Sequence, residues 1–157
     1  MSGFWRLVAS LGLPQAVGIL SGLATARGVR GWYPGLEKPS FNPPSWVFAP
    51  VWTALYLAMG VAAWLVWRKG LDAPGVRPAL LAFLVQLALN GLWSLLFFSL
   101  RSPGLALAEI TVLWAAIGVT TILFFRQSGL AGWLMAAYWA WVTFAALLNF
   151  SIWRLNA

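Results

Sequence analysis

The sequence predicts an all-α, polytopic membrane protein, folded as a bundle of five transmembrane helices. Of its 157 residues, 62% are hydrophobic and only 8% are charged, which is far from the averages of soluble domains. Apolar stretches of about 20 residues, enough to cross about 30 Å of hydrocarbon, recur along nearly the whole chain. The apolar character persists to Trp153, so a single signal peptide does not explain it. We expect one transmembrane domain over residues 1–157.

The first predicted helix covers residues 4–24. Pro14 is expected to kink it. Gly18 and Gly22, four residues apart, allow a neighbouring helix to approach closely, and ordinary packing accounts for them. The connection that follows, residues 25–45, contains three basic residues, Trp32 and four prolines. It is neither a span nor a minimal turn, so we expect it to form a lid.

The other four helices are predicted between short breaks rich in Arg, Gly, Pro and Ser. They cover residues 46–67, 79–99, 104–125 and 130–152. Connections this short imply antiparallel neighbours in a bundle. Five spans place the two termini on opposite faces of the membrane. The basic residues divide evenly between the two faces, so the positive-inside rule leaves the orientation open.

The composition excludes several kinds of chemistry. The chain has no cysteine and no histidine, which rules out thiol and imidazole nucleophiles, Cys/His zinc sites and a Ser-His-Asp triad. The usual axial ligands of haem are therefore missing, so a tetrapyrrole would be held by its shape, with no metal or cofactor required. The net charge is +7, but the basic residues are scattered between apolar helices. This pattern favours lipid head groups of the bilayer, or ligand carboxylates, over nucleic acid.

Twelve tryptophans in so short a chain require an explanation. Those near the predicted helix ends suit the membrane interface, where indoles are enriched. Others fall deeper, where an indole N–H needs a partner or a polar cavity. These deeper residues are Trp52, Trp93, Trp114, Trp139 and Trp141.

Polar and aromatic side chains recur at helical spacing on three predicted helices. They are Trp52 and Tyr56; Gln86, Asn90, Trp93, Ser94 and Phe97; and Tyr138, Trp141, Ala145 and Asn149. Polar groups inside a membrane cost free energy unless they hydrogen-bond, so these faces should turn toward one another. They could simply hold the helices together, or they could line a small-molecule pocket. Glu109, predicted inside a span, is a candidate proton carrier or hydrogen-bond anchor, and its place near a helix N-terminus favours the anchor.

A specific motif covers the connection and the start of the second helix. It reads WYPGLEKPSFNPP from Trp32 and continues as WVFAPVWT from Trp46. Further matches are QLALNGLW from Gln86, the acidic Glu109, and YWAW from Tyr138. On these residues the chain strongly resembles the TspO/MBR family, the tryptophan-rich sensory proteins and mitochondrial translocator proteins. The resemblance covers all five spans.

The resemblance implies a five-helix bundle, often a homodimer, whose pocket opens toward the lid. The family's pocket accepts protoporphyrin-type tetrapyrroles and synthetic isoquinoline or benzodiazepine ligands. By position in the matched motifs, the ligand-binding residues would be Tyr33, Pro43, Trp46, Phe48, Trp52, Tyr56, Asn90, Trp93, Ser94, Trp141, Ala145 and Leu148. Trp52 and Trp141 would also carry a light-dependent breakdown of bound porphyrin, since an indole can donate an electron to an excited porphyrin or trap reactive oxygen. That chemistry needs no base or metal.

The leading hypothesis is a membrane receptor or sensor of tetrapyrroles such as protoporphyrin IX, whose propionates approach Arg27, Arg30 or Lys38. A transporter of porphyrin or sterol, a porphyrin-degrading enzyme and a structural partner protein are the alternatives. The absence of evident inverted repeats argues against transport, and the sterol-associated pattern is only partly present, with Phe150 where Tyr is expected. Ala137 replaces a proline common in the family, which leaves the aim of Trp141 open. A short C-terminus without a basic extension predicts a bacterial cell membrane.

Overall fold

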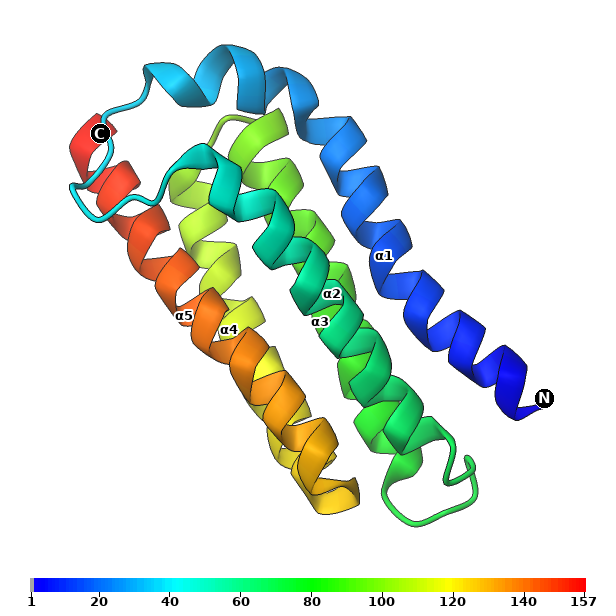
Figure 1. Ribbon diagram of the computed structural model, residues 1–157. Helices are drawn as coiled ribbons and strands as arrows, with labels where there is room; N and C mark the ends of the chain where they lie inside the picture. The colour runs from blue at the N-terminus through cyan, green and yellow to red at the C-terminus, as the bar shows by residue number, and fades with distance from the viewer. Residues whose placement is uncertain (1) are drawn as a thin grey trace.

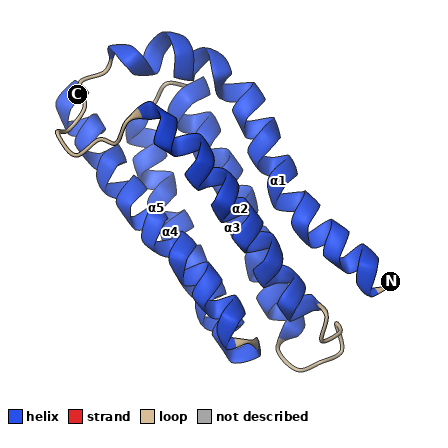
Figure 2. Cartoon of the chain, viewed as in Figure 1, coloured by secondary structure: helices blue, strands red, loops and turns tan. Residues whose placement is uncertain are grey.

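The computed structural model describes residues 2–157, and this part of the chain contains helices and no strands (Figures 1 and 2). Its five long helices are α1 (Gly3–Arg27), α2 (Ser45–Trp67), α3 (Val76–Ser94), α4 (Pro103–Gln127) and α5 (Gly129–Asn156). All five segments are long and apolar enough to cross a membrane. The two termini lie at opposite ends of the bundle (Figure 1). The predicted all-α bundle of five spans is confirmed, and the chain is an integral, multi-pass membrane protein.

The five helices are not packed with equal density. Helix α4 packs along both α3 and α5, and α1 packs mainly against α2. In the half of the bundle nearer the N-terminus, fully buried side chains such as Met59 of α2 and Met135 of α5 fill the interior. In the same core, the ring of Phe83 on α3 stacks on that of Phe124 on α4, with centroids 5.8 Å apart. Helix α1 buries few of its residues and lies at the edge of the bundle (Figure 1). The space for a cavity is therefore at the opposite end.

The lid predicted at residues 25–45 is wrong in its first half. Helix α1 continues as a π-helix, Gly28–Trp32, and a 3₁₀ turn, Tyr33–Gly35. The prolines that prevent helix formation begin only at residue 34, so the residues before it keep the N–H groups that a helix needs. Gly28 also packs directly on the Phe98 carbonyl, where a Cβ would overlap the oxygen. Only residues 36–44, which we call the strap, connect α1 to α2 without helix.

The other predicted boundaries lie within four residues of the observed ones, and the predicted helix ends at 67 and 99 are the ends of α2 and of the π-helix that continues α3. Helix α3 starts at Val76, before Pro78. A proline is tolerated in the first turn of a helix, because the N–H groups of that turn have no hydrogen-bond partner within the helix. Helix α3 continues as a π-helix, Leu95–Ser99. The Ser102 and Ser128 hydroxyls each accept a hydrogen bond from a first-turn N–H, of α4 and α5 respectively. These caps explain why α4 and α5 begin where they do.

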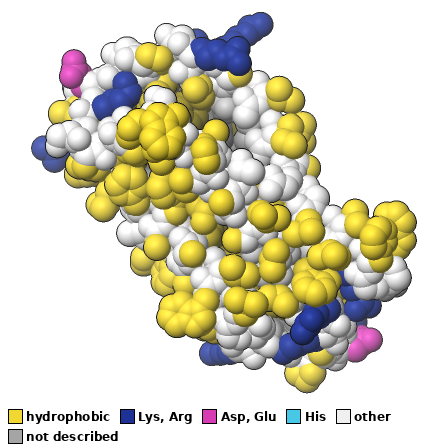
Figure 3. Space-filling view, viewed as in Figure 1, with side chains coloured by type: hydrophobic (Ala, Val, Ile, Leu, Met, Phe, Trp, Pro, Cys, Tyr) yellow, Lys and Arg dark blue, Asp and Glu magenta, His cyan; other side chains and the backbone are white. Residues whose placement is uncertain are grey.

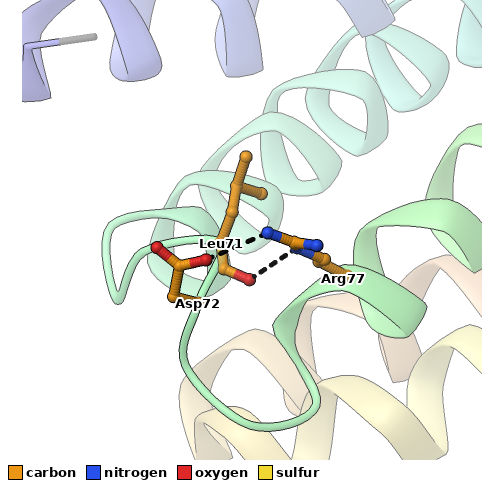
Figure 4. Close-up of polar contacts among 3 residues, drawn as sticks. All are labelled: Leu71, Asp72 and Arg77. Carbon is orange, nitrogen blue, oxygen red and sulfur yellow. Dashed lines mark hydrogen bonds and ion pairs between the residues drawn. The ribbon is translucent and has the colours of Figure 1, made fainter.

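The loop between α2 and α3 is held by hydrogen bonds to its own backbone and to the end of α4. Arg77 donates to the Leu71 carbonyl at 3.0 Å and forms an ion pair with Asp72 at 2.9 Å (Figure 4). Both side chains of the pair are mostly exposed, so it contributes little stability. Gln127 donates to the Pro74 carbonyl at 3.0 Å, and Lys69 to the Gln127 carbonyl. The loop therefore closes the end of the bundle away from the cavity.

Candidate functional site

A cavity of about 940 Å³ lies in the half of the bundle nearer the C-terminus. Its walls come from α1, the strap, α2, the end of α3 and α5. The volume is near the upper limit for small-molecule sites in proteins. Figure 3 shows apolar side chains over much of the face drawn and Lys and Arg side chains gathered toward the two ends. The cavity is therefore largely apolar, and it lies in the membrane-spanning bundle near one of the two ends that carry basic side chains.

Two tryptophans meet at a right angle in the cavity wall. The ring centroids of Trp52 and Trp141 lie 6.3 Å apart with an interplanar angle of 88°. Phe48 packs edge-on against Trp141 at 6.2 Å, and Tyr56 lies 5.7 Å from Trp52. Phe48, Trp52 and Tyr56 share one face of α2 because they are four residues apart. Helix α5 is continuous through Ala137, and Trp141 still contacts Trp52 in the cavity wall.

Another part of the wall is built where the π-helix Leu95–Ser99 faces the 3₁₀ turn Tyr33–Gly35. The Phe97 and Phe98 rings, on the π-helix that continues α3, lie against Tyr33, at 6.3 and 5.5 Å. Trp93 packs on Phe97 at 5.4 Å. All four residues line the cavity. π-helical turns are frequent at functional sites, because they shift side chains out of the regular helical register.

The floor of the cavity is a hydrogen-bonded chain across three helices. The Tyr56 hydroxyl donates to Asn90 Oδ1 at 2.6 Å, and Asn90 Nδ2 donates to the Tyr138 hydroxyl at 2.8 Å. Gly18 allows the Tyr56 ring to lie close to α1, since a Cβ there would come within 2.7 Å of the ring. These contacts satisfy polar groups that would otherwise be costly in the apolar interior. They also separate the cavity from the packed half of the bundle.

The indole N–H groups of the cavity differ in their partners. Trp93 Nε1 donates to Asn149 Oδ1 at 2.9 Å, and Asn149 Nδ2 donates to the Pro103 carbonyl at 2.9 Å. The Trp93 N–H is therefore used by the protein itself. Among residues 2–157, Trp52 Nε1 forms no hydrogen bond, and Trp141 Nε1 is buried without a partner. The indole N–H groups of Trp52 and Trp141 therefore remain without hydrogen-bond partners in the described chain.

Lys38 is the one charged side chain among the residues that line the cavity within the described chain. Its Nζ lies 4.8 Å from the Tyr33 ring centroid and donates to the Pro34 and Leu36 carbonyls at 3.3 and 3.0 Å. No group of three or more metal-ligating side chains occurs in residues 2–157. The site can therefore hold an apolar, aromatic molecule and attract one anionic group, but it offers no acid–base pair for hydrolysis.

Ten of the twelve residues expected at the ligand site line the cavity, and two do not. Those that do are Tyr33, Pro43, Phe48, Trp52, Tyr56, Trp93, Ser94, Trp141, Ala145 and Leu148. Asn90 is part of the floor but is buried behind Tyr56, so it does not line the cavity. Trp46 is 76% exposed on the outer surface, because it is not on the face of α2 that carries Phe48 and Trp52. Its position at the helix end suits the membrane interface.

The wall contributed by α1 was not expected from the sequence. It includes Gly18, Ser21, Gly22 and Thr25, small residues three and four apart on one helix face. We expected the glycine pair to serve ordinary packing. That holds for Gly18, which contacts Tyr56, but a Cβ on Gly22 would meet no atom within 4 Å. A stripe of small and weakly polar residues was the available signal for a cavity wall.

The remaining deep tryptophans and the acidic residue lie elsewhere. Trp114 Nε1 donates to the Thr143 hydroxyl at 2.8 Å, and Trp139 packs over Gly118, so both join α4 to α5. Glu109 is buried, and neither carboxylate oxygen has a hydrogen-bond partner within residues 2–157. The anchoring hydrogen bond expected of Glu109 is therefore not formed there. None of these residues lines the cavity.

Five transmembrane helices, four of which contribute to the wall of an aromatic cavity, define an integral membrane protein with an intramembrane cavity of small-molecule size. The chain belongs to the TspO/MBR family, whose family model matches residues 10–154. It is 40% identical to the tryptophan-rich protein TspO of Archaeoglobus fulgidus over 97% of both chains. It is 42% identical to the translocator protein of Homo sapiens over 80% of this chain and 75% of that one. It is 41% identical to the tryptophan-rich sensory protein of Cereibacter sphaeroides over 80% and 77%.

Proposed function

We propose that the protein is a membrane receptor or sensor that binds porphyrin-type tetrapyrroles, with protoporphyrin IX as the expected ligand. The observation that carries the proposal is the 940 Å³ aromatic cavity with the perpendicular Trp52 and Trp141 in its wall. A large planar ring can stack on one indole and meet the edge of the other, which are the two favourable aromatic geometries. The bound porphyrin would lie beside two electron-rich rings, which supports its light-dependent degradation there.

The names of the relatives support a sensing role in a membrane. One relative is called a tryptophan-rich sensory protein and another a translocator protein. The second name favours the second candidate, a transporter of porphyrin or sterol across the membrane. The floor formed by Tyr56, Asn90 and Tyr138 opposes transport in this conformation, because it separates the cavity from the other half of the bundle. Flux of porphyrin into sealed liposomes that contain the protein, above that of empty liposomes, would favour the transporter.

The test of the proposal is a titration of detergent-purified protein with protoporphyrin IX in the dark, followed by tryptophan fluorescence. A cavity lined by three tryptophans should give strong, saturable quenching at one porphyrin per chain. The same titration at several detergent concentrations separates a site from partition into micelles, because only partition scales with the volume of detergent. Quenching that never saturates, and that falls in proportion as detergent is added, would refute the proposed receptor.

Lys38→Gln is expected to weaken binding of protoporphyrin IX by about tenfold, the value of one charge-assisted hydrogen bond. Lys38 is the cation on the cavity wall, so it is the group placed to meet a propionate. The dimethyl ester of the porphyrin has no carboxylate and should bind both forms equally. Arg30→Gln removes the same charge from an exposed residue outside the wall and is the matched control. Equal losses for acid and ester, or for both variants, would contradict the role of Lys38.

A further inference from the structure

The strap, residues 36–44, is attached to the last turn of α5 by one side chain. Asn156 Oδ1 accepts a hydrogen bond from the Glu37 N–H at 3.0 Å, and Asn156 Nδ2 donates to the Glu37 carbonyl at 2.9 Å. The same Nδ2 donates to the Ile152 carbonyl at 2.8 Å. An amide has two N–H bonds and one carbonyl, so every group of this side chain is engaged. The bond to Ile152 fixes the amide in the orientation that pairs with Glu37.

Asn156 is the strap's link to the distant part of the bundle. In the described chain, every other hydrogen bond of the strap stays within residues 33–47. Three of the nine strap residues are prolines, which have no N–H to donate. Outside these bonds, Phe41 contacts Phe144 with ring centroids 6.3 Å apart. Leu36 packs on the cluster that includes Ile152 of α5. Apart from these apolar contacts, the hydrogen bonds that hold the strap to α5 come from the amide of one residue.

This link lies at the edge of the cavity. Lys38, the residue after Glu37, lines the cavity, as do Asn42 and Pro43 farther along the strap and Ile152 on α5. Asn156 itself does not line it. We propose that Asn156 is a positioning residue that holds the strap over the cavity mouth and thereby sets the rate at which a ligand enters and leaves, an inference that rests on the proposed ligand site. Breaking the link frees the strap and leaves the wall residues on the helices in place.

The first experiment measures the strap without any ligand. Glu37 and Glu109 are the two glutamates of the chain, and Glu109 is buried in α4, so a glutamate-specific protease should cut after Glu37. Cleavage of a folded protein follows the population of the open state. Asn156→Ala removes both bonds to Glu37 and should speed this cleavage about tenfold. Leu155→Ala, an exposed change in the same helical turn, should leave it unchanged.

Cleavage before Asp72, by an aspartate-specific protease, is the internal reference for folding. Asp72 lies on the exposed loop at the other end of the bundle, so its cleavage should be equal in all variants. Asn156→Asp is the second variant. It keeps an acceptor for the Glu37 N–H but replaces the donor to the Glu37 carbonyl with a carboxylate, and should also release the strap. Wild-type cleavage at Glu37 in both Asn156 variants, with unchanged cleavage at Asp72, would overturn the link.

The second experiment measures exchange of protoporphyrin IX by stopped-flow tryptophan quenching in the dark. With Asn156→Ala, association and dissociation should both accelerate about tenfold while the equilibrium affinity changes little, since the free strap opens more often. Faster Glu37 cleavage with unchanged exchange rates would overturn the control of the cavity by the strap. If wild-type protein shows no saturable porphyrin binding, the proposed function fails, and control of ligand exchange fails with it. The cleavage experiment still decides whether Asn156 holds the strap.

Discussion

Replacing both Trp52 and Trp141 with phenylalanine should reduce the light-driven loss of bound protoporphyrin IX to the rate seen in empty micelles. An excited porphyrin can take one electron from an indole ring, leaving an indole radical cation and a porphyrin radical anion. Dioxygen, the oxidant, can add to a carbon of that radical anion as a peroxyl group, and this new C–O bond is the step that consumes the porphyrin. A phenyl ring is much harder to oxidise, so it does not supply the electron. The aromatic contact survives, so binding in the dark should weaken by less than about tenfold. Absorbance of porphyrin under constant illumination, at equal occupancy, measures the loss.

Trp139→Phe is the matched control for this pair. It removes an indole two residues from Trp141 on the same helix, but one that packs over Gly118 and does not line the cavity. It should keep the wild-type photochemistry. If the double variant degraded porphyrin as fast as wild type, or if Trp139→Phe lost as much activity, the corner of two indoles would not be the reactive site.

Asn90→Ala is expected to lower the free energy of unfolding by about 2–4 kcal/mol, the sum of two buried hydrogen bonds and a cavity. The substitution leaves the Tyr56 and Tyr138 hydroxyls without their shared partner in the interior of the bundle. Hydrogen bonds between membrane helices average about 0.6 kcal/mol, so most of the loss comes from the unpaired groups and the empty space. Reversible unfolding in SDS, followed by circular dichroism, measures it.

A second substitution tests the cause of that loss. In the Asn90→Ala background, Tyr138→Phe removes one of the two stranded hydroxyls and should recover part of the stability. In the wild-type background, the same change breaks a satisfied bond and should destabilise. Such a change of sign is a direct measure of coupling between the two residues. Additive effects would mean that Asn90 contributes by its volume alone.

Much of the fold follows from the sequence because the membrane restricts the secondary structures that a spanning segment can adopt. Backbone groups in hydrocarbon must satisfy one another, so apolar stretches of this length have to be helices. The breaks rich in Arg, Gly, Pro and Ser then divide the chain correctly into five. The end of the first helix was placed too early, because residues 25–33 look polar enough for a loop. A tertiary contact, Gly28 on the Phe98 backbone, extends the helical backbone beyond what local composition indicates.

The candidate site was predictable where residues carry a recognisable pattern, and less so where their role depends on packing. The shared face of Trp52 and Tyr56 follows from helical spacing, and Phe48 was expected there only from the family resemblance. The α1 wall did not follow, since small residues serve close packing and an open space equally well. The position of Asn90 behind Tyr56 did not follow either, because sequence spacing gives the face of a helix but not the depth of a side chain behind its neighbours.

The floor built from Tyr56, Asn90 and Tyr138 makes the cavity a dead end, since Tyr56 lines the cavity and the buried Asn90 and Tyr138 lie behind it. A dead-end site exchanges ligand with a single pool, here the water and the membrane leaflet at the end that holds the C-terminus. Its occupancy would report the ligand concentration on that side even when the other side holds a very different amount. If the protein is the receptor proposed here, the direction in which the chain inserts decides which of the two pools it would measure.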